Sequence, residues 1–278
     1  MIYILADNVT SPLGATTAQN YEAVAAGRSA LRRCERWHGL EQPFSAALFT
    51  EEQTQGMAQK GLTRFESLAY CSALAAIRDS GISVSRPDTI FILSTTKANI
   101  ELGDAMPSES AQHIAAKLGF KSQPIVVCNA CISGVSAIML AQRLLESGRY
   151  GYAVVCGADV QSLFTVAGFQ SLGALSQEPC RPFDIDRTGL SLGEAAATIV
   201  FGREAPEGGA AWAVTDSAAR NDACHVVTPS RQAEGASNAL RALTAAGRHS
   251  LMCTARAPCS TTRWRPWHLA EAAWTTCR

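Results

Sequence analysis

The chain alternates short apolar runs with longer stretches in which apolar residues recur every three or four positions. The short runs are rich in β-branched residues and predict strands, and the longer stretches have the spacing of amphipathic helices. We expect strands at 2–5, 89–94, 125–128, 152–155, 198–201 and 212–218, and helices at 16–26, 64–80, 108–118, 132–147 and 237–246. This alternation predicts an α/β fold.

Glycines mark the expected helix ends. Gly81, Gly119 and Gly148 each follow a helical stretch directly, at the position where a left-handed residue commonly ends a helix. Between about 155 and 187 the chain is rich in Gly and Pro, so we expect turns there rather than a regular element.

Composition excludes some partners. The 278 residues are 47% apolar and 17% charged, with 24 basic against 24 acidic side chains. A zero net charge gives no electrostatic footprint for nucleic acid or for an anionic membrane. No run approaches the roughly 18 apolar residues of a membrane span, and the first residues do not resemble an export signal. We expect a cytoplasmic protein that binds neither nucleic acid nor membrane.

The chain contains ten cysteines, a density well below the more than about 8% that is typical of disulfide scaffolds. Several of them lie in apolar runs, where cysteine acts as a small hydrophobic side chain. We therefore expect most of the cysteines to be reduced thiols.

Residues 249–278 differ from the rest of the chain. They hold three of the five Trp and three of the ten Cys, and they lack Gly, Val, Ile, Phe, Tyr, Asn, Asp and Lys. Neither strand alternation nor a complete helical stripe is present. We therefore assign the fold core to 1–248 and treat 249–278 as an atypical tail.

Cys131 is the first candidate for chemistry. It follows an apolar strand and a sharp turn, and directly precedes an expected helix. A thiolate is the reactive form of cysteine, and the positive end of a helix dipole stabilises it. The alternative is a structural cysteine. Cys128 and Cys131 also form a CxxC, but a redox pair needs facing sulfurs, and a zinc site needs a second ligand pair that the chain lacks.

His225 is the second candidate. It stands in NDACHVVTPS at the end of an expected strand. A lone histidine there is equally compatible with a polar residue that only satisfies its own hydrogen bonds. A functional role requires that the fold bring it to the cysteine helix, because such partners meet in space rather than in sequence.

Four segments together resemble a known family. NACISG around Cys131, SLGALS at 171–176, CRPFDIDRTGLSLGEAAATIVF at 180–201 and NDACHVVTP at 221–229 are similar to motifs in the N-terminal half of the beta-ketoacyl-[acyl-carrier-protein] synthases. The resemblance covers about 1–248. It implies a thiolase-like layered α/β fold, of which this chain holds the first half and largely lacks the second.

The resemblance also implies an activity. Members of this family are acyltransferases that perform a decarboxylative Claisen condensation in fatty-acid or polyketide synthesis. Cys131 matches the nucleophile that is acylated, and His225 matches the first histidine, which can hydrogen-bond the thioester oxygen as enolate charge develops. The implied partner is an acyl carrier protein that delivers acyl and malonyl groups. The intact protein is expected to be a homodimer or heterodimer, without a bound cofactor or metal.

Three charged residues match the same family motifs. Asp184, Arg187 and Glu194 stand in the PFD and GEA parts of the third segment. We expect them to form turns and anchor loops rather than to act on the substrate.

The second half of the family pattern is absent from the chain as written, including its HGTGT-type motif and its GFGG loop. The codons of the tail allow an explanation. If reading starts at the third base of each codon, Met252 and Cys253 force Val, Cys253 and Thr254 allow only His or Tyr, and the next positions permit Gly, Thr, Gly, Thr. VHGTGTVLDDAME is encodable in this frame. We hypothesise a frame change between Gly247 and Met252, which would impair activity.

Two further functions remain open. The chain could be a noncatalytic fragment that at most binds a carrier protein or another partner. It could also be a thiolase or a cysteine thioester hydrolase, although NDACHVVTP differs from the thiolase motifs around histidine.

Overall fold

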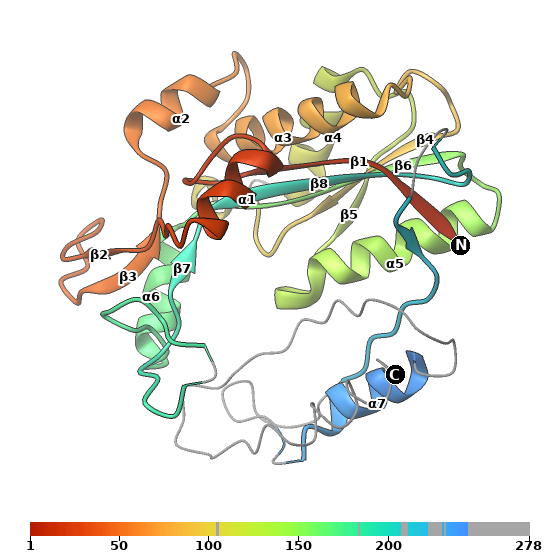
Figure 1. Cartoon of the computed structure of the whole chain (residues 1–278). Helices are drawn as coiled ribbons and strands as arrows, with labels where there is room; N and C mark the ends of the chain where they lie inside the picture. Colours follow the sequence, from red (N-terminus) through yellow and green to blue (C-terminus); the bar gives the residue numbers. More distant parts are fainter. Residues whose placement is uncertain (104–105, 183, 207–210, 222–229, 231, 244–278) are drawn as a thin grey trace.

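A six-stranded mixed sheet forms the centre of the protein. The computed structural model describes the chain except residues 104–105, 183, 207–210, 222–229, 231 and 244–278 (Figure 1). The strand order is β5-β4-β6-β8-β1-β9. Their bounds are β5 Ile125–Val127, β4 Thr89–Ser94, β6 Tyr152–Asp159, β8 Ala195–Gly202, β1 Ile2–Thr10 and β9 Ala213–Val214. Strands β5, β4 and β6 run parallel, and β8 pairs antiparallel with both β6 and β1.

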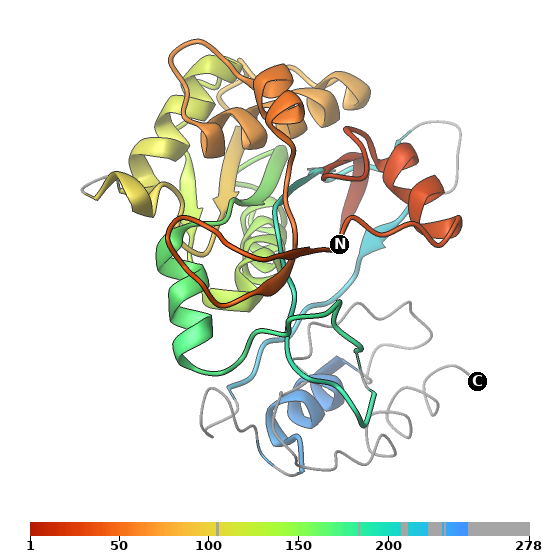
Figure 2. The ribbon, with the colours of Figure 1, turned by 90° about the vertical axis from the view of Figure 1, so that its left-hand side faces the viewer.

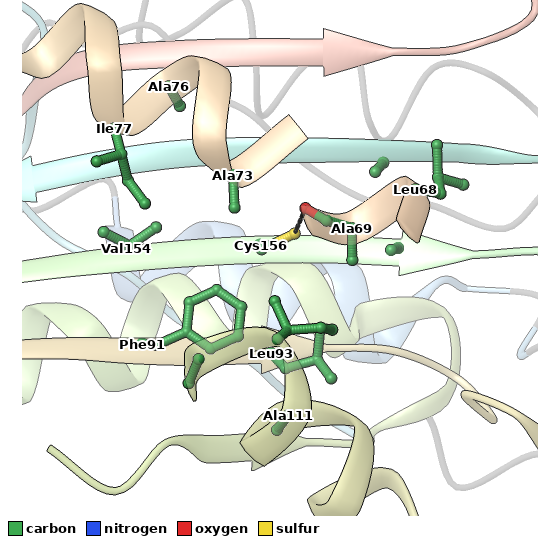
Figure 3. Packing of buried hydrophobic residues seen from close by; sticks show 14 of the residues in the cluster. Leu68, Ala69, Ala73, Ala76, Ile77, Phe91, Leu93, Ala111, Val154 and Cys156 are labelled. Carbon is green, nitrogen blue, oxygen red and sulfur yellow. Dashed lines mark hydrogen bonds between the residues drawn. The ribbon is translucent and has the colours of Figure 1, made fainter. Parts of the chain in front are cut away.

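Helices α3 (Arg64–Ser80) and α4 (Pro107–Leu118) cover one face of this sheet (Figure 1). Thr63 forms a capping box with Glu66 at the start of α3, and Gly81 ends the helix with φ 66°. Figure 3 shows apolar side chains of α3 and α4 against β4 and β6. Phe91 and Val154 are fully buried in this layer, and each buried side chain of this size stabilises the fold by about 1.5–3 kcal/mol.

Helix α5 (Ser133–Glu146) covers the opposite face of the sheet (Figure 1). Its buried residues Ala137, Ala141 and Leu145 pack against Ile90 and Ile92 of β4. Successive residues of β4 therefore point into different layers, because side chains alternate across a strand. The sheet is covered on both sides at β4 and β6, which explains why the central residues of these strands, Ile90–Leu93 and Ala153–Cys156, are apolar.

A second, smaller sheet lies beside the first. It joins β2 (Arg32–Cys34), β3 (Phe44–Ala47) and β7 (Leu192–Gly193) in this order. Val166 of α6 (Leu163–Ser171) is buried with Phe44 and Ala46 of β3. Figure 2 shows α6 in green beside the 3-10 turn η1 (Ile100–Leu102), with which it is in contact. The remaining described helices are α1 (Thr17–Ala25), α2 (Glu51–Met57) and α7 (Glu234–Leu243).

The expected elements are mostly confirmed. Helices α1, α3, α4 and α5 lie within one or two residues of the expected ranges, and β4 has the expected bounds. Gly119 and Gly148 have φ 91° and 75°, as expected for residues that end helices. The expectation of irregular turns after 155 was wrong in part, because β6 continues to Asp159 and α6 follows. Only Ala213–Val214 of the expected strand at 212–218 is a strand.

Some expectations concern residues that the structure does not describe. These are His225, the assigned boundary at 248, and the tail at 249–278 with the proposed frame change. Among the described helices, none combines the length and the apolar character needed to cross a membrane.

Candidate functional site

The carboxyl ends of three parallel strands meet at one edge of the central sheet. Ser94, Val127 and Gly157 are paired at or near the ends of β4, β5 and β6. The segments that follow these strands therefore lie side by side. They are Thr95–Lys97 after β4, the Cys128–Cys131 turn after β5, and Asp159 at the end of β6. Crevices at the carboxyl ends of parallel strands are common sites for ligands in α/β proteins.

The turn that carries Cys131 is tight and is held by its own polar groups. A 3-10 turn η2 (Ala130–Ile132) separates β5 from α5. The Asn129 N–H donates to Ser133 Oγ at 2.8 Å, and Ser133 Oγ donates to the Ala130 carbonyl oxygen at 2.7 Å. Ala130 has φ 45°, a left-handed conformation that costs energy for a residue with a Cβ. This strained turn places Cys131 two residues before Ser133, the first residue of α5.

Cys131 and Cys128 are both exposed free thiols. Cys131 lies close to the amino end of α5, which is the positively polarised end of the helix dipole. An exposed sulfur in this position is accessible to a thioester and has the setting of an activated nucleophile. The strand, turn and helix around Cys131 are as expected from the sequence, while its catalytic role stays a prediction.

Asp159 organises the neighbouring segment. Its carboxylate accepts hydrogen bonds from Thr95 Oγ1 at 3.0 Å, from Thr96 Oγ1 at 2.9 Å and from the Thr96 N–H at 3.2 Å. Lys97 Nζ lies 3.3 Å from Asp159 Oδ1, and the Lys97 side chain is only 10% exposed. Sequence analysis missed Asp159, because the strand at 152–155 was expected to end four residues too early. It missed Lys97 because this residue meets Asp159 only through the pairing of β4 with β6.

Glu194 anchors several segments behind the site. Its side chain is 1% exposed, and its Oε2 lies 2.6 Å from Arg64 Nη2 at the start of α3. The same carboxylate accepts from the Phe49 N–H at 3.0 Å and from the Gln161 N–H at 2.9 Å. Glu194, which lies between β7 and β8, thus connects these strands to α3, to the segment after β3 and to the segment after β6. The expectation that it anchors loops is confirmed.

Asp184 and Arg187 form a turn, as expected. Asp184 Oδ1 accepts from the Asp186 N–H at 2.9 Å, and Arg187 Nη1 donates to the Asp184 carbonyl oxygen at 2.7 Å. These contacts are local to the turn.

A metal site requires several ligating side chains that lie close together. Among the described residues, no three His, Cys, Asp or Glu side chains are grouped in this way.

Comparison with known proteins identifies the segment that contains this site. Residues 93–206 match the family described as "Beta-ketoacyl synthase, N-terminal domain". This match includes Cys131, Asp159 and Glu194, whereas His225 lies beyond it. Nodulation protein E of Rhizobium sp. (strain N33) is 26% identical over 218 residues, which is 68% of this chain and 54% of that protein.

A longer alignment links the chain to 3-oxoacyl-[acyl-carrier-protein] synthase 2 of Vibrio cholerae. It is 26% identical over 272 residues and covers 84% of this chain and 66% of that protein. The chain therefore spans about half to two thirds of the length of these two relatives.

Solved structures show the same fold. A beta-ketoacyl synthase from Burkholderia phymatum has a TM-score of 0.62 at 23% identity, covering 72% of this chain and 58% of that chain. The ketosynthase ApeO of Xenorhabdus doucetiae, solved in complex with its chain length factor ApeC, gives 0.66 at 21% identity, with 86% and 67% covered. These similarities confirm the thiolase-like fold expected from the sequence. The chain is thus similar to the beta-ketoacyl synthases, and its residues 93–206 match their N-terminal domain.

Proposed function

We propose that the protein is an acyltransferase of the beta-ketoacyl-[acyl-carrier-protein] synthase type, with Cys131 as its nucleophile. The observation that carries the proposal is the position of Cys131. It is exposed on a strained turn directly before α5, inside the segment that matches the synthase N-terminal domain. Such a turn presents the sulfur to a substrate at the positively polarised end of a helix.

The proposed reaction has two stages. First, the Cys131 thiolate attacks the carbonyl carbon of an acyl thioester, and the carrier thiolate leaves. A malonyl thioester then loses CO2, and the resulting enolate carbon attacks the acyl group on Cys131. The new carbon–carbon bond forms as the bond to sulfur breaks, which returns the thiolate of Cys131 and releases a β-ketoacyl thioester. We assign His225 to the hydrogen bond that stabilises the enolate oxygen.

The proposed partner is an acyl carrier protein. Two observations on similar proteins support this choice: one relative is named a 3-oxoacyl-[acyl-carrier-protein] synthase, and a similar solved ketosynthase, AntDE, is described in complex with the acyl carrier protein AntF. ApeO is described in complex with a chain length factor, so we propose a homodimer or a heterodimer here. The pathway is proposed to be fatty-acid or polyketide synthesis, located in the cytoplasm.

A second candidate function is that the protein accepts an acyl group on Cys131, or binds a carrier protein, without completing the condensation. The exposed free thiol of Cys131 supports the first of these steps. A thiolase or a cysteine thioester hydrolase remains a less supported alternative.

Acylation of the protein by an acyl carrier thioester tests the proposal. Intact-mass measurement should show one acyl group on the full chain, and Cys131→Ala should abolish it. Cys128→Ala is the matched control and should leave acylation intact, because it removes the neighbouring exposed thiol of the same turn. Acylation that depends on Cys128 would refute the assigned nucleophile.

Addition of a malonyl carrier thioester separates the candidates. A β-ketoacyl product supports the synthase. A stable acyl-enzyme without product supports the partial function, and rapid release of free acid supports the hydrolase.

A further inference from the structure

Two exposed thiols lie close together in the sequence just before the start of α5. Cys128 and Cys131 lie three residues apart on one turn, and both are free. A reactive site needs one nucleophile, and an unselective pair would be open to acylation at the wrong sulfur. The carboxylate of Asp159 and its hydrogen bonds distinguish the two thiols.

These hydrogen bonds begin at Asp159 and reach the cysteine turn. Thr95 Oγ1 donates to the Asp159 carboxylate at 3.0 Å, and the Thr95 N–H donates to the Val127 carbonyl oxygen at 3.2 Å. Val127 directly precedes Cys128. Asp159 therefore fixes the segment that holds the end of β5, and so sets where the turn begins.

Lys97 completes this arrangement as the counter-ion of Asp159. Its Nζ lies 3.3 Å from Asp159 Oδ1 and 3.2 Å from Thr96 Oγ1. The side chains of Lys97 and Asp159 are 10% and 29% exposed, so solvent screens this pair less than a surface pair. The charges of such a pair act on the ionisable groups close to it, here the thiol of Cys128 in the neighbouring turn.

We propose that the Lys97–Asp159 pair positions the turn after β5 and selects its nucleophile, keeping Cys128 out of the acyl-transfer chemistry that we assign to Cys131. This inference rests on the proposed function, because it deepens the assignment of Cys131. Lys97 and Asp159 are positioning residues in this scheme and do not contact the reacting atoms.

The electrostatics of Cys128 agree with this geometry. Partial burial raises the pKa of the Cys128 thiol, and the negative charge of Asp159 raises the pKa further. Both effects disfavour the reactive thiolate. Cys128 is therefore held in its less nucleophilic form by its partial burial and by the same carboxylate that, through Thr95, fixes the end of β5.

Other charged groups near β5 are directed elsewhere. Helix α5 has no acidic residue in its first turn, and α4 has one exposed acidic residue, Glu109, in its first turn. His113 of α4 contacts Glu66 of α3, and Lys117 donates to the Lys60 carbonyl oxygen. The remaining charged groups of α5 are Arg143 and Glu146, near its far end.

Site-resolved alkylation of the full chain tests the inference. Iodoacetamide labelling is followed by peptide mass spectrometry between about pH 6 and 10, a range that includes the ordinary pKa of a thiol. Asp159→Asn should shift the labelling profile of Cys128 to lower pH. The ratio of Cys128 to Cys131 labelling at neutral pH should rise by roughly threefold to tenfold, because loss of the Asp159 charge lowers the pKa of the Cys128 thiol and increases its thiolate fraction.

Three control variants separate charge from structure. Asp159→Glu retains the carboxylate and should restore the parent profile. Lys97→Met leaves the carboxylate uncompensated and should not increase Cys128 labelling. Asp88→Asn removes a carboxylate just before the start of β4, at the opposite end of the sheet, and should have no effect.

Two results would overturn the inference. One is an unchanged Cys128 profile in Asp159→Asn, and the other is an equal increase in Asp159→Asn and Lys97→Met, which would indicate simple opening of the turn. These outcomes are independent of the proposed function, because labelling requires no acyl transfer. Failure of the proposed function would instead appear as acylation that does not depend on Cys131.

Discussion

Replacement of Glu194 by alanine should destabilise the protein strongly, because Glu194 is a buried charge with three partners. It contacts Arg64 Nη2 at 2.6 Å and accepts from the Phe49 and Gln161 N–H groups at 3.0 and 2.9 Å. These partners belong to three segments that are distant in sequence. Loss of the carboxylate removes all three contacts at once.

The expected magnitude follows from what each partner loses. The Gln161 N–H is buried and the Phe49 N–H is partly buried, and an unsatisfied buried donor costs about 1–3 kcal/mol. Arg64 is 40% exposed, so water can hydrate its freed guanidinium, and we assign it the smallest share. The two donors together give about 2–6 kcal/mol, a large part of the roughly 5–15 kcal/mol that stabilises an ordinary domain.

Urea unfolding of Glu194→Ala and Glu178→Ala side by side measures this effect. Glu178 also pairs with an arginine, Arg33, at 2.8 Å, but its side chain is 63% exposed. Water screens that pair, so Glu178→Ala should leave the unfolding midpoint unchanged within error. For Glu194→Ala we expect a midpoint lower by about 1 M or more at an unchanged slope. Equal midpoints for the two variants would refute the anchoring role of Glu194.

Three further predictions concern the thiols, the histidine and the frame. His225→Ala should lower malonyl decarboxylation by about 10²- to 10³-fold while alkylation of Cys131 continues; undiminished decarboxylation would contradict the assigned role. Complete burial raises the pKa of the Cys156 thiol to about 12, so Cys156 should resist thiol reagents near neutral pH in the folded chain and react only in denaturant. The pKa is higher in the folded state than in the unfolded state, so this thiol should also make the protein less stable as pH rises from about 9 towards 12. Sequencing of the gene should show a second-half reading frame after Gly247, and restoring it should increase both soluble yield and condensing activity; early stop codons in that frame would disprove the hypothesis.

The sequence predicts elements whose determinants are local. Helix α3 has an apolar stripe and a terminal glycine with φ 66°, and both are visible without tertiary information. The Cys131 turn is likewise local, since a strand, small residues and a helix follow one another directly. Such features depend on neighbouring residues, so one sequence is sufficient to identify them.

Other elements depend on distant partners and were missed. Helix α6 has apolar and small residues around much of its circumference, so it has no stripe that distinguishes it from a buried loop. The small sheet pairs Ala46 with Leu192, a contact across more than half of the chain. Lys97 and Asp159 also meet only through sheet pairing; a lysine after one apolar strand and an aspartate at the end of another were the available signals.

The strand order of the central sheet has a consequence for synthesis of the chain. The two neighbours of β1 are β8 and β9, and both follow residue 194 in the sequence. At about 5–20 residues per second, the ribosome needs roughly 10 to 40 s after making β1 before it reaches the first residue that can pair with it. The apolar residues of β1, including Ile2, which is fully buried in the finished sheet, have no strand partner during this time. Strand β1 is therefore among the last strands of the sheet to gain its partners, and until then α1 and α3, which both pack against it and follow it in the sequence, are described elements that can cover it.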